Sequence, residues 1–263
     1  MKKTYTVLLA VALIVAMAPS LAREIRTLTL GDDTEIELRV FPARGDTLLL
    51  GFPCDEGAGV NQEATARLLE EDGVEIWMPD LLTAYMLPKA RSSLRQIPDG
   101  VLLSLLEEAI KTGKKVFLIA SGPDSELVLR AAALWEKKYP DGPKSQALQG
   151  ALLLYPRLLK GKPEPGREPR YIDAVGKTRL PIMVLEGERT PNRWGIGHLT
   201  NALKAGGSDV YAKLIPGVRG YFVEREDTSP PEAMVASQLP GLIKASLYFL
   251  KGGHHVYTPR KTR

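Results

Sequence analysis

The spacing of hydrophobic and polar positions changes along the chain. Residues 25–30 and 34–41 alternate apolar and polar side chains on either side of a Gly-Asp-Asp turn at 31–33, which predicts a hairpin with one face in water. Residues 47–53 are continuously apolar, as expected of a strand covered on both faces. Further apolar runs predict strands at residues 74–79, 116–120, 150–155, 180–185 and 210–215.

Helical spacing of apolar residues fills most of the intervals between these strands. It predicts helices at residues 61–71, 101–112, 127–134, 196–205 and 231–250. A hairpin followed by alternating strands and helices favours an α/β fold with a mostly parallel sheet and helices on both faces. Such sheets bind ligands at the carboxyl ends of their strands. The loops expected at that edge are 52–59, 80–94, 121–125, 186–194 and 216–222.

The length of the chain favours one domain. Its 263 residues, 44% of them hydrophobic, are enough for a single sizeable core, which we assign to residues 23–251. Residues 160–178 are rich in proline, glycine and charge. Because strand and helix units resume after them, they are expected to form an exposed excursion within this domain. Residues 252–263 are expected to be a basic, flexible tail.

The N-terminal residues have the pattern of an export signal. Lys2 and Lys3 precede an apolar stretch at 6–17, and Ser20-Leu21-Ala22 places small residues where signal peptidase cleaves. We interpret residues 1–22 as a signal peptide cleaved after Ala22, which predicts a periplasmic or secreted protein with no stable membrane span after cleavage. The alternative is an uncleaved N-terminal anchor, although the apolar stretch is short for a span.

Charge and residue counts exclude several kinds of site. Removing the two lysines of the signal lowers the formal net charge of +4 by two, so the mature chain is nearly balanced and nucleic-acid binding is not expected. The single cysteine, Cys54, cannot form an internal disulfide. Only three histidines are present, and two of them, His254 and His255, lie in the tail. Neither a metal site nor a cofactor is therefore expected.

Five segments resemble the α/β-hydrolase fold superfamily, in its order and spacing. They are LLLGFP at 48–53, WMPDL at 77–81, FLIASGPDS at 117–125, VLEGERTP at 184–191 and LIPGVRG at 214–220. The third is similar to the strand–turn–helix that carries the nucleophile in the pattern G-x-S-x-G. The resemblance implies an α/β-hydrolase-like sheet over nearly the whole mature chain.

The resemblance fails at the catalytic positions. The nucleophile position corresponds to Gly122, the acid position to Thr190 and the base position to Gly220. Loss of the serine or the base removes most of the rate of such a triad. The sequence therefore favours an exported protein that has lost the standard triad and acts as a binding or accessory protein, with an unknown small molecule or protein as its partner. A further alternative is a scaffold whose excursion at 160–178 docks a partner.

The rival hypothesis is a periplasmic serine hydrolase, an esterase or acyl hydrolase with a displaced nucleophile. Ser121 and Ser125 are the candidate nucleophiles, and Glu188 or Glu186 would be the acid. The base is missing, because His198 falls in a predicted helix. A one-residue shift also turns a side chain to the other face of a strand. The alternative role for Ser125 is that of a helix cap.

Seven residues of the expected crevice are candidates for ligand contact: Phe52, Cys54, Tyr85, Arg91, Trp194, Arg219 and Tyr221. The two arginines, with the two tyrosines, are expected to converge near the strand ends and hold an anionic ligand. Trp194 is expected in a crevice loop, where its ring would contact a ligand. A thiol nucleophile at Cys54 has no histidine to activate it.

Overall fold

The computed structural model describes residues 24–31, 33–53, 59–164, 166–220, 222 and 226–253. The predicted signal peptide and most of the predicted tail lie outside these residues, as do Cys54 and Tyr221.

A single sheet of eight strands forms the centre of the structure, in the order β1-β2-β4-β3-β5-β6-β7-β8. β2 pairs antiparallel with β1 on one side and with β4 on the other, and the five remaining pairs, from β4–β3 to β7–β8, are parallel. The predicted mostly parallel sheet with an N-terminal hairpin is confirmed. The strands are β1 Glu24–Thr29, β2 Glu35–Phe41, β3 Thr47–Phe52, β4 Val74–Pro79, β5 Lys115–Ser121, β6 Leu148–Leu154, β7 Ile182–Gly187 and β8 Val210–Ile215.

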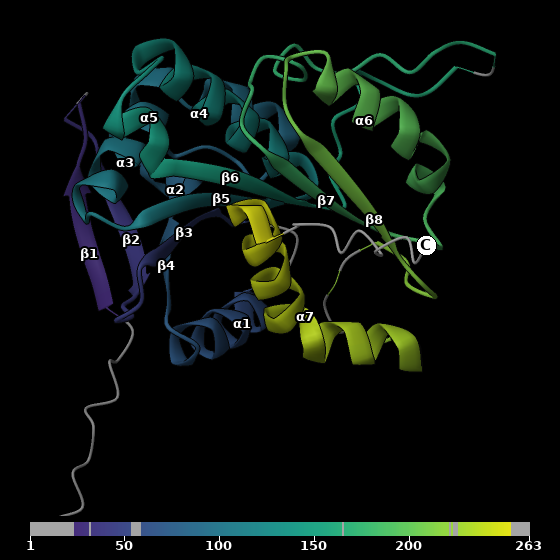
Figure 1. Cartoon of the computed structure of the whole chain (residues 1–263), viewed down its shortest axis with the longest axis horizontal. Helices are drawn as coiled ribbons and strands as arrows, with labels where there is room; N and C mark the ends of the chain where they lie inside the picture. The colour runs from purple at the N-terminus through teal and green to yellow at the C-terminus, as the bar shows by residue number, and fades with distance from the viewer. Residues whose placement is uncertain are drawn as a thin grey trace, which may run out of the picture.

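Helices cover both faces of the sheet (Figure 1). α1 and α7 lie on one face, and α3, α4 and α6 lie on the other, as the two clusters of buried side chains also require. The helices are α1 Gly59–Glu71, α2 Leu81–Ala84, α3 Asp99–Lys111, α4 Ser125–Lys138, α5 Pro143–Ala147, α6 Ile196–Lys204 and α7 Pro230–Tyr248.

Three short elements were not expected from the sequence. α2 and the 3-10 turn Arg91–Gln96 lie between β4 and α3, where the loop 80–94 was expected, and α5 lies in the loop before β6. α2 forms because the carboxylate of Asp80 accepts a hydrogen bond from the backbone N of Thr83 at 3.1 Å, which satisfies one free donor of the helix start. These elements are too short to show a helical period in the sequence.

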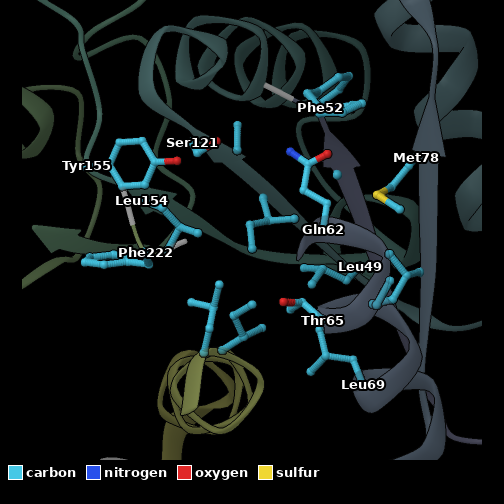
Figure 2. A pocket seen from close by; sticks show the side chains of 18 residues that line it. Leu49, Phe52, Gln62, Thr65, Leu69, Met78, Ser121, Leu154, Tyr155 and Phe222 are labelled. Carbon is cyan, nitrogen blue, oxygen red and sulfur yellow. The ribbon is translucent and has the colours of Figure 1, made fainter. Parts of the chain in front are cut away.

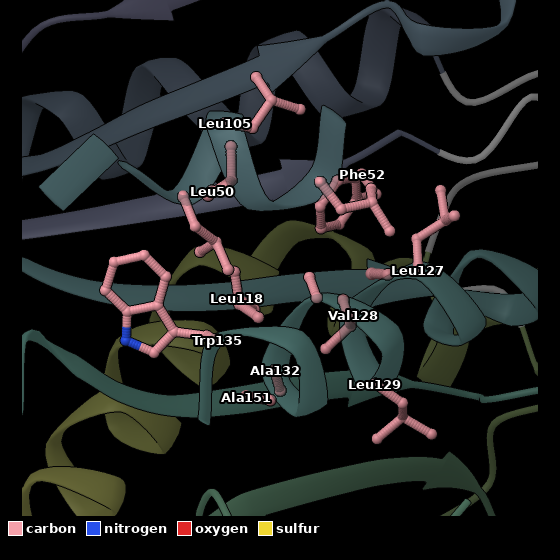
Figure 3. Close-up of a cluster of buried hydrophobic side chains, with 14 of the residues drawn as sticks. Leu50, Phe52, Leu105, Leu118, Leu127, Val128, Leu129, Ala132, Trp135 and Ala151 are labelled. Carbon is pink, nitrogen blue, oxygen red and sulfur yellow. The ribbon is translucent and has the colours of Figure 1, made fainter. Parts of the chain in front are cut away.

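The core depends on the alternation of side chains along β5. Leu118 and Ala120 join the cluster packed under α3 and α4 (Figure 3), which also contains Trp135. Phe117 and Ile119 face the opposite side, towards α1 and α7. Every second residue of a strand points to the same face, so the position of each β5 side chain is decided by its place in this alternation.

α7 is fixed to the loop after β8 by charged hydrogen bonds. Ser229 and Glu232 form a capping box at the helix start, and the Glu232 carboxylate accepts hydrogen bonds from Arg219 Nε at 2.6 Å and Nη2 at 2.8 Å. The Arg219 guanidinium holds the pKa of Glu232 well below its usual range. Arg219 Nη1 also donates to Asp227 at 2.6 Å, so its donor fork is occupied within the fold.

One helical stretch, residues 230–252, is long and apolar enough to cross a membrane on length and composition alone. Core helices of soluble proteins meet the same criterion. In this stretch Leu239, Ile243 and Leu247 are buried in the cluster on the α1 side of the sheet.

We expect Leu118→Ala to lower the free energy of unfolding by about 2–5 kcal/mol, because Leu118 is fully buried in a central strand and the substitution leaves a cavity. Urea denaturation followed by circular dichroism measures the change. The matched control is Leu68→Ala on α1, where Leu68 is 47% exposed and a change within about 0.5 kcal/mol is expected. Equal losses for the two variants would contradict the assignment of the core.

Candidate functional site

The turn after β5 has the geometry of a strand-to-helix elbow. β5 ends at Ser121, and Gly122 turns the chain with a φ of 54°, a left-handed conformation that glycine adopts without strain. One 3-10 turn, Gly122–Asp124, leads into α4. The Gly122 carbonyl accepts a hydrogen bond from the backbone N of Arg157 at 2.9 Å, which fixes the elbow to the segment after β6.

The segments after β6, β7 and β8 meet at this edge of the sheet. A Cβ built on Gly220 would lie 3.4 Å from Cγ2 of Thr190 and 3.8 Å from Cβ of Tyr155. The positions that the resemblance assigns to the acid and the base are therefore in contact. Neither Thr190 nor Gly220 carries a carboxylate or an imidazole, and the Thr190 hydroxyl donates to Glu186 Oε1 at 3.0 Å.

Glu186 is a buried carboxylate at the end of β7, with 1% of its surface exposed. Burial raises its pKa, because the charged form loses its hydration, while hydrogen bonds from Thr190, the Gly187 backbone and Asn192 and the charge of Arg157 act against this rise. The backbone N of Gly187 donates to Oε1 at 3.0 Å. Glu186 thus accepts hydrogen bonds that hold the β7 turn.

A charged pocket of about 400 Å³ opens beside Glu186. Its lining includes Arg157, Arg189 and Arg219, together with Tyr155 and Thr190. Arg219 is held by its carboxylate partners, whereas the Arg189 side chain makes no hydrogen bond or ion pair with the part of the chain that the structure describes. The pocket lies where the catalytic acid and base would stand in the fold that the sequence resembles.

A second cavity, of about 100 Å³, lies on the α1 and α7 face of the sheet (Figure 2). Ser121 lines this cavity, because it shares the face of β5 that carries Phe117 and Ile119. Phe52 lines it as well, so one predicted ligand contact and one predicted nucleophile meet here. Tyr155 lines both this cavity and the charged pocket, and it separates the two.

The other candidate catalytic residues lie elsewhere. Ser125 is fully buried and is the first residue of α4, with Asp124 in the cap position, so the alternative role of Ser125 as the helix cap is wrong. Glu188 Oε2 accepts a hydrogen bond from the backbone N of Gly217 at 3.0 Å and does not line the cavity of Ser121. His198 lies on α6, as predicted, and is exposed.

Most predicted ligand residues do not converge. Arg91 Nη2 donates to the carbonyl of Leu159 at 2.7 Å, and Tyr85 packs at the edge of the core on the α3 side; neither lines the charged pocket with Arg219. Trp194 is 77% exposed, with the guanidinium of Arg193 4.1 Å from its ring centre. In the described segments, no group of three or more His, Cys, Asp or Glu side chains is placed to hold a metal ion.

Sequence reasoning missed Gln62 and Thr65 on α1, which also line the apolar cavity. Their signal was present: together with Ala66 and Leu69 they follow the three- and four-residue spacing of the buried helix face. Two uncharged polar residues on a buried helix face indicate that the face borders a cavity with polar groups in its lining. Tyr155 and Arg157 were missed because they follow β6 outside the family-like segments.

Comparisons with solved structures find the same architecture in esterases. Carboxyl esterase 2 of the fungus Tuber melanosporum is 14% identical, covering 91% of this chain and 90% of its own, with a TM-score of 0.61. An esterase of Pyrobaculum calidifontis is 16% identical, covering 87% of this chain and 86% of its own, with a TM-score of 0.60. Thermogutta terrifontis esterase 2, phosphorylated by paraoxon, is 13% identical, covering 88% and 95%, with a TM-score of 0.59.

No protein-family model and no curated protein matches the chain. At these identities the structural likeness defines the fold alone. The chain has the α/β-hydrolase fold, as the five resembling segments implied.

We expect the stability of Glu186→Gln to increase relative to that of the wild type as the pH rises from about 4 to 7. Burial in the folded state raises the pKa of Glu186. The contribution of this carboxyl group to stability is therefore fully present below its pKa in the unfolded chain, and it is lost as the pH rises through its pKa in the folded protein. Glutamine keeps a carbonyl oxygen for Gly187 and Thr190. Urea midpoints of both proteins across this range measure the difference, and a pH-independent difference would contradict the expectation.

Proposed function

We propose that this protein is an exported, non-catalytic binding or accessory protein that uses the α/β-hydrolase fold as a scaffold for a ligand. The observation that carries the proposal is Gly122 at the elbow, with its left-handed φ of 54°. Glycine has no side-chain atom that attacks a substrate, and Thr190 and Gly220, which contact each other, supply neither the acid nor the base of a triad.

The placement of the two serines supports the same proposal. A serine hydroxyl needs a base to take its proton, and the only histidine among the described residues is His198, exposed on α6. Ser121 makes no side-chain hydrogen bond with the described part of the chain, and no base lines its cavity there. Ser125 is fully buried, so an ester substrate has no access to it.

A serine hydrolase with a displaced nucleophile is the second candidate function. The similarity in fold to three esterases favours it, and Ser121 lines a cavity, whereas Ser125 is fully buried. In this hypothesis the enzyme would act on ester or acyl bonds through Ser121, with a base supplied by a group other than the described histidine.

We expect the mature protein to remain unlabelled by a fluorophosphonate probe, and Ser121→Ala to leave its rate of p-nitrophenyl acetate hydrolysis unchanged. Among the described residues no base is placed to activate a serine, so any residual rate should be that of a folded protein surface. Mass spectrometry of the probe-treated protein and initial rates measure the two quantities. Ser125→Ala and Ser92→Ala are compared in parallel, the latter as an exposed control. A probe adduct on one serine, with the rate lost in its alanine variant, would establish the hydrolase instead.

Export is supported by the N-terminal sequence. We expect the full chain, expressed in a Gram-negative bacterium, to be recovered from the periplasm or medium with Arg23 as its first residue, because small residues at Ser20 and Ala22 fit signal peptidase. The intact mass of the purified protein measures the cleavage position. A full-length protein retained in the membrane fraction would favour the uncleaved anchor.

A further inference from the structure

The apolar cavity is the part of the crevice on the α1 and α7 side of the strand ends, and its lining includes Phe52, Ser121 and Tyr155 from those ends. It lies between the sheet and helices α1 and α7, on the side of β5 to which Ser121 points. Its walls come from β3, β4, β5 and β6 and from buried residues of both helices, among them Leu69 and Ile243. At about 100 Å³ it approaches the size of an engineered 150 Å³ apolar cavity that binds benzene.

The charge of the lining restricts the ligand. None of the described side chains that line the cavity is charged. An ionised carboxylate or ammonium group entering it would lose its hydration without gaining a partner of opposite charge, at a cost of several kcal/mol. The charged pocket on the other side of Tyr155, with its arginines, offers that partner instead. The ligand of the apolar cavity should therefore be uncharged.

Three polar side chains of the cavity determine which polar group the ligand should carry. Gln62, Thr65 and Ser121 line the cavity and are only partly buried, and none makes a side-chain hydrogen bond within the described residues. Figure 2 shows the Gln62 amide and the Thr65 hydroxyl directed between α1 and the sheet, with Ser121 across from them. An amide and two hydroxyls both donate and accept hydrogen bonds, so they match a ligand with its own hydroxyl or amide group.

We propose that this cavity binds a small uncharged molecule with a short hydrocarbon body and one hydroxyl or amide group, held by Gln62, Thr65 and Ser121. The proposal rests on the non-catalytic binding function, and it adds the place and the chemical class of the ligand. Apolar walls exclude water from the hydrocarbon part, and the three polar groups orient the other end.

Butan-1-ol and butyrate, which share a four-carbon chain, test the proposal. The mature protein is labelled with [13C-methyl]methionine, because Met78 lines the cavity while Met86 and Met234 are 93% and 60% exposed. We expect butan-1-ol to shift the Met78 methyl resonance in a saturable way and to leave Met86 and Met234 in place. Butyrate at the same concentrations should leave Met78 unshifted.

Substitutions in the cavity locate the binding. Ser121→Ala and Thr65→Val each remove one hydroxyl and should weaken butan-1-ol binding by about three- to tenfold, the worth of one neutral hydrogen bond. Ala66→Leu, on the buried face of α1, should fill the cavity and abolish the shift. Ser92→Ala, an exposed serine outside the cavity, is the matched control and should bind as the wild type does.

The proposal is overturned if butan-1-ol leaves Met78 unshifted, if butyrate shifts it equally, or if Ser121→Ala and Thr65→Val bind as tightly as Ser92→Ala. The first two variants decide the question even if Ala66→Leu does not fold. Fluorophosphonate labelling of a serine with an intact butan-1-ol titration would refute the non-catalytic function and leave the cavity's ligand class standing.

Discussion

The two-residue period of β5 is the constraint on which the candidate site depends. β5 is central in the sheet and covered on both faces, so Leu118 and Ala120 must pack under α3 and α4, while Phe117 and Ile119 pack towards α1 and α7. Continuing the alternation turns Ser121 towards the α1 side and leaves Gly122 to form the elbow. The Ser121 hydroxyl, one residue before the elbow, therefore faces the apolar cavity and does not line the charged pocket at the ends of β6, β7 and β8.

Two sites of opposite character result from this arrangement. The cavity on the α1 and α7 face is lined by uncharged residues, and the pocket at the ends of β6, β7 and β8 is lined by arginines and a buried carboxylate. Tyr155 separates them, buried and packed edge-to-face against Phe222 with ring centres 5.5 Å apart. Its φ of 37° is unusual for a residue with a side chain. The ion pairs of Arg219 hold the adjacent β8 loop to α7, which stabilises the wall of the charged pocket.

The sequence predicted the fold well because the signals for it are local and repeated. Each buried strand is an apolar run between turn residues, and the segments resembling the α/β-hydrolase fold appear in its order. The site was predicted less well. Arg219 was expected to hold an anion, but its partners Asp227 and Glu232 come from a later segment, and no local pattern reveals ion pairs across eight and thirteen residues. Arg91 and Tyr85 lie between β4 and α3, where the helical turns are too short to show a periodic pattern of apolar residues. The directions of these two side chains could therefore not be predicted. Gln62 and Thr65 could have been found from the buried face of α1.

The apolar cavity also has a mechanical consequence. An empty space inside a folded protein is eliminated when the chain unfolds, so unfolding reduces the volume of the system and hydrostatic pressure favours it. The unoccupied space of about 100 Å³ between the sheet and helices α1 and α7 contributes to this volume change to the extent that water does not fill it. A ligand that fills the cavity would reduce this contribution, so occupancy would make the protein more resistant to pressure as well as more stable.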